Sequence, residues 1–139
     1  MYEHYSRQAL PPKKYRELLG SAISVFNSNN QFVIENILSI DNANFNWYNL
    51  IDKTSGQLND PIKNTITENS NDEIAVIFKS LVEKRNRIIH SFQITHEDEQ
   101  TLATKDRNHN QFIITEEYLL DFIKENELLS SKLHELRGY

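Results

Sequence analysis

The sequence DEIAVIFKSLVEKRNRIIHS, residues 72–91, is the most informative stretch of this 139-residue chain. Its apolar residues recur at the three- and four-residue spacing of an amphipathic helix, namely Ile74, Ile77, Phe78, Leu81, Val82, Ile88 and Ile89. Because successive helical residues are turned by about 100°, these side chains fall in one arc. The pattern therefore predicts a helix from Asp72 to Ser91 with one buried face.

Arg85 interrupts this apolar arc. It projects into the middle of the arc, where Phe78 and Ile88 are among its neighbours. A guanidinium keeps its charge, and burying it without a partner is costly. The compensation has to come from a carboxylate, a helix C-terminus, a second subunit or an anionic substrate. His90 follows five residues later, and histidine is the residue type that exchanges a proton near neutral pH. We therefore treat Arg85 and His90 as a candidate site.

Both residues also fit a purely structural interpretation. An Arg in an apolar stripe is commonly ion-paired in a core or an interface. A His near a helix C-terminus commonly interacts with the negative end of the helix dipole. From spacing alone, the structural interpretation is favoured over the functional one.

The string Arg85-Asn86-Arg87-Ile88-Ile89-His90 resembles the Arg-x4-6-His motif of the HEPN superfamily, in which a polar residue commonly follows the Arg. The resemblance covers the motif, its position late in a long helix, and the size and helical character of the chain. It implies a compact all-α bundle. It also implies either a metal-independent endoribonuclease from a toxin–antitoxin, abortive-infection or CRISPR-linked defence system, or a module that has lost catalysis and binds nucleotides or proteins.

The resemblance assigns roles to the motif residues. His90 is expected to remove the proton from a ribose 2′-hydroxyl, which attacks the adjacent phosphorus and leaves 2′,3′-cyclic phosphate and 5′-hydroxyl ends. Arg85 offers a bidentate fork to the phosphate oxygens and to the charge of the transition state. Asn86, one turn before His90, is expected to orient the ring or the phosphate. The expected contacts to the RNA are Lys84, Arg87 and Ser91. No metal ion and no cofactor is expected.

The spacing of the motif predicts how its parts come together. Five residues place Arg85 and His90 about 140° apart on a straight helix, so they do not easily converge on one phosphate. Either the helix frays before His90, or two copies complete the sites across a twofold axis. HEPN enzymes are usually composite dimers of this kind, so the resemblance implies a homodimer, with an antitoxin or another defence-system protein left open as a further partner.

Phe92 departs from the pattern of one HEPN group. In toxins paired with nucleotidyltransferase antitoxins, a Tyr two residues after the motif His is the site of modification. This chain has Phe92 at that position, so an antitoxin of that class is not implied.

Composition limits the function classes. A length of 139 residues predicts one domain, residues 1–139, with residues 1–11 as an irregular arm. The absence of cysteine excludes disulfides and thiol chemistry and fits the cytoplasm. No apolar run approaches the length of a membrane span, so no membrane contact is expected.

Charge argues against a protein that coats nucleic acid, because the net charge is −5. Basic residues nevertheless gather between residues 79 and 90, which favours a local phosphate contact: Lys79, Lys84, Arg85, Arg87 and His90. The structural alternative is a solvated helix face that carries a Glu83–Arg87 ion pair.

The rest of the chain is predicted to be mostly helical. Periodicity favours one long helix from Pro12 to about Ser39, with two collinear helices as the alternative. It also favours a final helix that Thr115 caps and Gly138 ends. Residues 92–115 are the least helical part. The expected fold is therefore an all-α, HEPN-like bundle of four or five helices, with a small β-hairpin between about residues 100 and 115 left open.

One other cluster has the composition of a metal site. His96-Glu97-Asp98-Glu99 concentrates oxygen and imidazole ligands suited to Mg²⁺ or Mn²⁺. A solvated loop is the favoured interpretation.

Overall fold

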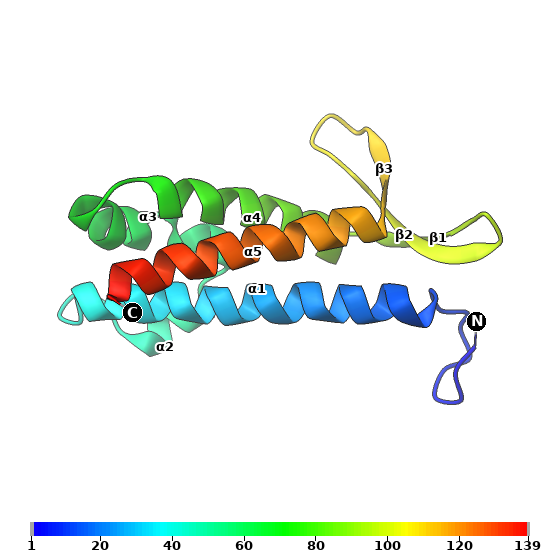
Figure 1. Ribbon diagram of the computed structural model, residues 1–139, viewed down its shortest axis with the longest axis horizontal. Helices are drawn as coiled ribbons and strands as arrows, with labels where there is room; N and C mark the ends of the chain where they lie inside the picture. Colours follow the sequence, from blue (N-terminus) through cyan, green and yellow to red (C-terminus); the bar gives the residue numbers. More distant parts are fainter. Residues whose placement is uncertain (1, 139) are drawn as a thin grey trace.

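Three long helices form the body of the molecule in the computed structural model, which describes residues 2–138 (Figure 1). They are α1 (Lys13–Ile40), α4 (Glu73–Ile89) and α5 (Glu116–Arg137). α1 and α5 run in the same direction along the long axis, and α4 runs in the opposite direction (Figure 1). α1 is continuous, which confirms the prediction of one long helix.

Short helical segments connect α1 to α4. They are α2 (Trp47–Asp52), η1 (Ser55–Leu58), α3 (Asn59–Ile62) and η2 (Lys63–Thr67). Leu58, Ile62 and Ile66 from this connection are fully buried. The connection thereby closes the core at the end of the bundle where α4 begins.

Each long helix contributes one phenylalanine to the centre of the core. The ring of Phe26 stacks on those of Phe78 and Phe122, with 6.1 Å between ring centroids in both pairs. All three side chains are fully buried. Burial of one such side chain stabilises the fold by roughly 1.5–3 kcal/mol. These rings hold α4 at a fixed rotation against α1 and α5.

The prediction of an all-α fold was wrong, because the chain also forms a three-stranded antiparallel sheet. The fold is mixed α/β, with 64% of the residues helical and 12% in strands. The strands are β1 (Phe92–His96), β2 (Glu99–Lys105) and β3 (Gln111–Ile114), in the order β1-β2-β3. The hairpin that the sequence left open corresponds to β2 and β3, and β1 is the strand that sequence reasoning missed.

The turn between β1 and β2 explains why β1 was missed. Glu97 and Asp98 form it, both with left-handed backbone conformations (φ 51° and 65°). Two-residue turns of this kind usually carry Asn-Gly or Asp-Gly, and this chain has neither here. β1 then pairs along its whole length with β2, from Phe92 opposite Ala103 to His96 opposite Glu99.

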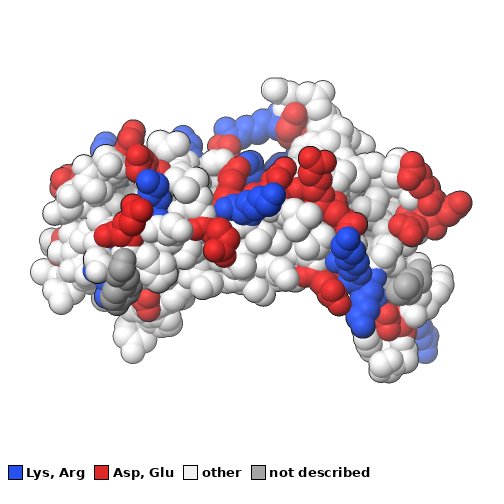
Figure 2. All heavy atoms as spheres, viewed as in Figure 1, with Lys and Arg blue, Asp and Glu red and all other residues white. Residues whose placement is uncertain are grey.

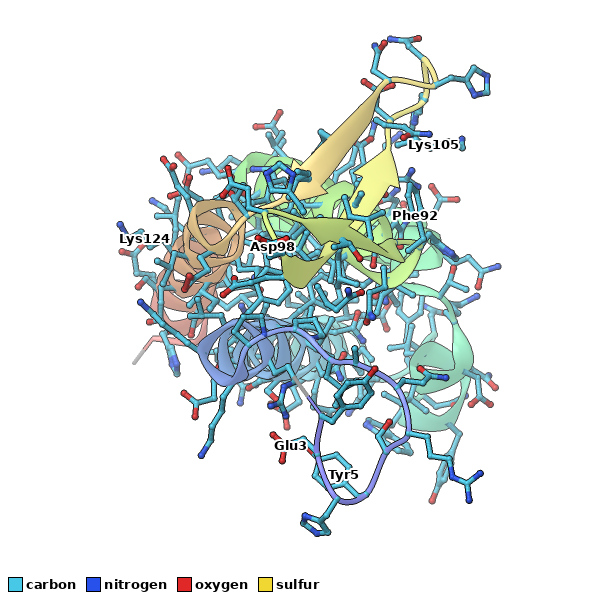
Figure 3. The ribbon with its side chains drawn as sticks, turned by 90° about the vertical axis from the view of Figure 1, so that its right-hand side faces the viewer. Glu3, Tyr5, Phe92, Asp98, Lys105 and Lys124 are labelled. Atoms are coloured by element: carbon cyan, nitrogen blue, oxygen red, sulfur yellow. The ribbon has the colours of Figure 1, made fainter. Side chains whose placement is uncertain are left out.

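Contacts with the helices stabilise the sheet. The Tyr15 hydroxyl of α1 donates a buried hydrogen bond of 2.6 Å to the Ile114 carbonyl of β3. A two-stranded ribbon alone would be marginal, and the third strand together with this contact removes that weakness. The sheet lies at the end of the bundle where α4 ends and α5 begins (Figures 1 and 3).

The N-terminal arm, residues 2–12, lies at the same end of the molecule and contains neither helix nor strand (Figure 3). Arg16 of α1 holds it through a 2.7 Å ion pair with Glu3 and a 2.9 Å hydrogen bond to the Pro11 carbonyl. Gln93 of β1 donates a 2.8 Å hydrogen bond to the Ala9 carbonyl.

The ends of α5 confirm the predicted caps. The Thr115 hydroxyl accepts a 3.0 Å hydrogen bond from the Tyr118 backbone N–H, and Gly138 ends the helix in a left-handed conformation. Of the helices within residues 2–138, none combines the length and the apolar character that crossing a bilayer requires.

Candidate functional site

Arg85 lies in the middle of the buried face of α4, as the apolar spacing predicted. The fully or nearly buried residues of this face are Ile74, Phe78, Leu81, Val82 and Ile88. The Arg85 guanidinium carbon is 5.0 Å from the centroid of the Phe26 ring, and Nε donates a 3.2 Å hydrogen bond to Asn86 Oδ1. Partial burial lowers the pKa of the guanidinium, which still stays charged at neutral pH.

No carboxylate compensates this charge within the described residues. The ion pairs among residues 2–138 involve other cations, and Arg85 takes part in none of them. A cation–π contact contributes about 0.5–1 kcal/mol at a partly exposed site. The N–H groups on the two terminal nitrogens of Arg85 make no hydrogen bond in this part of the chain. The terminal N–H groups of Arg85 are therefore available to donate hydrogen bonds to another group.

His90 ends α4, and its side chain is exposed. Its backbone N–H donates a 2.9 Å hydrogen bond to the Asn86 carbonyl, as in a regular helix. The helix therefore does not fray before His90, and that alternative is ruled out. Arg85 faces Phe26 of α1, about 140° around the helix from His90. No hydrogen bond joins the two side chains within residues 2–138.

Two exposed apolar side chains flank His90. Ile89 is 53% exposed and Phe92 is 42% exposed. The Ser91 hydroxyl donates a 2.7 Å hydrogen bond to the Ile88 carbonyl, so it is engaged at the end of the helix. This surface at the end of α4 combines an exposed histidine with exposed apolar area.

The other predicted contact residues point to a different side of α4. Lys84 forms an ion pair with Glu125 of α5, and Arg87 donates a hydrogen bond to the Lys105 carbonyl of β2. Glu83 pairs with Arg107 at 3.3 Å, so the Glu83–Arg87 pair of the structural interpretation does not form.

A pocket of about 360 Å³, here called the hairpin pocket, lies between α4 and the β2–β3 hairpin. Its lining includes Lys84, Asn86 and Arg87 of α4, Asp106 and Arg107 of the turn, and Phe112 of β3. Asn86 both lines this pocket and accepts the hydrogen bond from Arg85. Sequence reasoning missed Arg107, whose only signal was its place in the polar turn at residues 106–110.

Asp106 shapes the turn that carries Arg107. Its carboxylate accepts hydrogen bonds from the backbone N–H groups of Asn108, at 2.8 Å, and Asn110, at 3.0 Å. These hydrogen bonds lower the pKa of Asp106, and the bond from the Asn110 backbone has the largest effect. The Asp106 carboxylate therefore interacts with the backbone of its own turn.

Charges of both signs are mixed on the face drawn in Figure 2, where Lys and Arg side chains lie among Asp and Glu. This face has no continuous basic surface on which a long duplex would lie.

His96, Glu97, Asp98 and Glu99 belong to β1, β2 and the turn that joins them. His96 Nε2 lies 3.8 Å from Glu97 Oε1. Nowhere in residues 2–138 do three or more His, Asp or Glu side chains gather in a way that would hold a metal ion.

Comparison with known protein families, with curated proteins and with solved structures finds no match to this chain. The resemblance to the HEPN superfamily accordingly rests on the residues of the motif and their placement on α4.

Proposed function

We propose that this protein is a metal-independent endoribonuclease of the HEPN type that acts as a homodimer. Arg85 would bind the scissile phosphate, and His90 would act as the general base on the ribose 2′-hydroxyl. The attack on phosphorus would leave 2′,3′-cyclic phosphate and 5′-hydroxyl ends.

The observation that carries this proposal is the unpaired charge of Arg85. A guanidinium in the middle of a buried helix face normally has a carboxylate partner. Here its neighbours are an aromatic ring and a neutral amide, and its terminal N–H groups are unused in the described chain. Such a group is suited to a doubly charged phosphorane, because fixed donors in a dry site stabilise charge that develops in the transition state.

The separation of Arg85 and His90 on α4 is the reason for proposing a homodimer. Within one chain the two side chains lie on different sides of α4. A twofold axis near the end of α4 would bring His90 of one copy towards Arg85 of the other and would cover Ile89 and Phe92. Each site would then take its cation from one copy and its base from the other.

Several further expectations belong to the proposal. Asn86 would hold Arg85 in position through the hydrogen bond that its Oδ1 accepts from Arg85 Nε. The role would be that of a toxin or a phage-defence effector in the cytoplasm, where an antitoxin or another defence-system protein is a further partner. The lack of cysteine is in keeping with that compartment.

The second candidate is a catalytically inactive HEPN-like module that acts through protein contacts. The exposed apolar side chains of Ile89 and Phe92 favour it, because a scaffold needs such a surface. In that case, a carboxylate of the partner protein would neutralise Arg85.

The chemistry of the cut separates the two candidates. The purified protein, incubated with a diverse RNA pool in EDTA, is expected to produce fragments with 2′,3′-cyclic phosphate ends. A single 2′-deoxy substitution at the cut site should block cleavage. Replacing His90 or Arg85 with Ala should lower the rate at least about a hundredfold.

The matched control is His96→Ala, which removes another exposed histidine from the same end of the molecule. It should leave the rate within about twofold, because His96 is outside the proposed site. Cleavage of DNA or of the deoxy-blocked RNA would exclude the mechanism, and an absolute need for Mg²⁺ would exclude metal independence.

A further inference from the structure

We infer that the hairpin pocket is a nucleotide-binding subsite that takes one unit of a single-stranded RNA. The phosphate would lie at Arg87 and Arg107, and the base would lie against Phe112 between the amides of Asn86 and Asn108. This inference rests on the proposed function, because that function identifies the bound polymer as RNA. The binding of a single nucleotide does not depend on cleavage.

The charge of Arg87 makes the pocket selective for an anion. Arg87 is half-buried and donates to the Lys105 carbonyl, and no carboxylate of residues 2–138 forms an ion pair with it. Its bond to β2 fixes the guanidinium in position while its other N–H groups stay available. An arginine held in this way is well suited to the oxygens of a phosphate.

The other two cations of the pocket have carboxylate partners. Lys84 pairs with Glu125, which lies outside the pocket lining, and Arg107 pairs with Glu83, which lies inside it. The Arg107 side chain is 87% exposed, so it moves at little cost. A phosphate entering the pocket would exchange Glu83 for its own oxygens at Arg107.

The remaining lining residues suit a base better than a bare phosphate. Phe112 is half-buried, and the centroid of its ring lies 5.8 Å from the centroid of the Tyr118 ring. This contact holds Phe112 in place beside the pocket. Unpaired bases bind to proteins by stacking on such rings and by hydrogen bonds to amide side chains. Asn86 uses Oδ1 for Arg85 and leaves its amide N–H groups for a ligand. The volume of about 360 Å³ lies within the range of small-ligand sites.

Asn86 connects this subsite to the proposed cleavage site. It is the residue next to Arg85 in the chain, and its side chain lines the pocket while bonded to the guanidinium. An RNA with its scissile phosphate at Arg85 would therefore place a neighbouring nucleotide in the hairpin pocket.

The test is an NMR titration of the His90→Ala protein with the four nucleoside 5′-monophosphates and with inorganic phosphate. Addition of a nucleotide should shift the backbone amide signals of Asn86, Arg107, Asn108 and Phe112. At least one nucleotide should bind at least about tenfold more tightly than inorganic phosphate, because the base adds stacking.

Variants identify the groups that bind. Arg87→Gln should weaken nucleotide binding at least about tenfold, since it removes a charged hydrogen-bond donor. Arg107→Gln should also weaken binding, and this exposed residue can be replaced without disturbing the fold. Glu83→Gln should strengthen binding about threefold, because it removes the carboxylate that competes for Arg107. The matched controls are Lys124→Gln and Glu127→Gln, both at exposed positions of α5 outside the pocket.

Three results would overturn the inference. The first is equal weakening by Lys124→Gln and Arg87→Gln, and the second is equal strengthening by Glu127→Gln and Glu83→Gln. The third is equal affinity for inorganic phosphate and for the nucleotides. RNA cleavage by the wild type without any nucleotide effect at the pocket would overturn the subsite alone. Nucleotide binding at the pocket in a protein that cleaves no RNA would overturn the proposed function and leave the subsite standing.

Discussion

Arg85 lies over the ring of Phe26, with 5.0 Å between the guanidinium carbon and the ring centroid. Phe26 in turn stacks on Phe78 and Phe122, so the motif arginine is held against the aromatic centre of the core. The arrangement fixes the position of a charge without neutralising it. This is what an anion-binding group needs, and it comes at a cost in folding free energy.

Replacing Arg85 with Met should therefore raise the free energy of unfolding by about 1 kcal/mol, because the apolar chain keeps the packing and removes the partly desolvated charge. Chemical denaturation of the wild type and the variant measures this difference. Lys79→Met, on the exposed face of the same helix, is the control and should be nearly neutral. A loss of about 3 kcal/mol or more in Arg85→Met would mean that a carboxylate compensates the charge of Arg85 in the folded protein.

Asn86→Asp should stabilise the protein and inactivate it. The side chain keeps its shape, and the carboxylate would turn the 3.2 Å hydrogen bond from Arg85 Nε into a charged pair. We expect a gain of about 1 kcal/mol in unfolding free energy and at least about a tenfold loss of RNA cleavage, because the neutralised guanidinium binds phosphate poorly. Asn86→Ala should lower activity without the gain. An active Asn86→Asp enzyme would contradict the proposed role of Arg85.

Asp106 makes the hairpin turn sensitive to acid. Its pKa is lowered in the folded protein, chiefly by the backbone N–H of Asn110, from an ordinary value of 3.8. The stability that this carboxylate gives the turn is therefore present above that ordinary value and is lost as the pH falls through the lower, folded value. The protection factors of the Asn108 and Asn110 amides, which compare each observed exchange rate with the intrinsic rate at the same pH, should fall at the acid end of the range from pH 5 to pH 2.

Asp106→Asn is the matched variant, because it keeps the shape of the side chain and removes its charge. It should loosen the turn at the pH values where Asp106 is charged, and it should abolish the acid effect. Asp121→Asn, an exposed aspartate on α5, should leave the exchange of both amides unchanged. Acid sensitivity that persists in Asp106→Asn would show that another group holds the turn.

The sequence was a good guide where one periodicity dominated. The helical spacing on α4 correctly placed Arg85 in the middle of the buried face, and Thr115 and Gly138 correctly marked the ends of α5. Each of these features depends on residues close together in the chain, so local patterns were sufficient to predict them.

The sheet and the hairpin pocket were beyond the reach of local patterns. β1 depends on a turn at Glu97 and Asp98 that lacks the usual residues, and on pairing with β2. The pocket requires that Arg107 come back against α4, 24 residues from Glu83. The partner of Arg87 is likewise a backbone carbonyl, at Lys105. Contacts of this kind depend on how the chain folds back on itself, and residue types alone do not predict them.

The homodimer is a separate prediction. Light scattering at micromolar concentration should give about twice the chain mass of 16.4 kDa. Replacing exposed Ile89 and Phe92 with Asp should yield monomers, whereas Val76→Asp, an equally exposed apolar residue nearer the start of α4, should not. A strict monomer, with or without RNA, would remove the composite site.

Complementation between two inactive variants tests most directly whether Arg85 and His90 act together on RNA across two copies. Arg85→Ala and His90→Ala proteins would be unfolded together, refolded as a mixture and assayed for RNA cleavage in EDTA. Half of the dimers would be mixed, and each mixed dimer would hold one site with both Arg85 and His90, so activity should return to about a quarter of the wild-type level. A mixture that stays as inactive as its two components, although mixed dimers form, would contradict a site shared between Arg85 of one copy and His90 of the other.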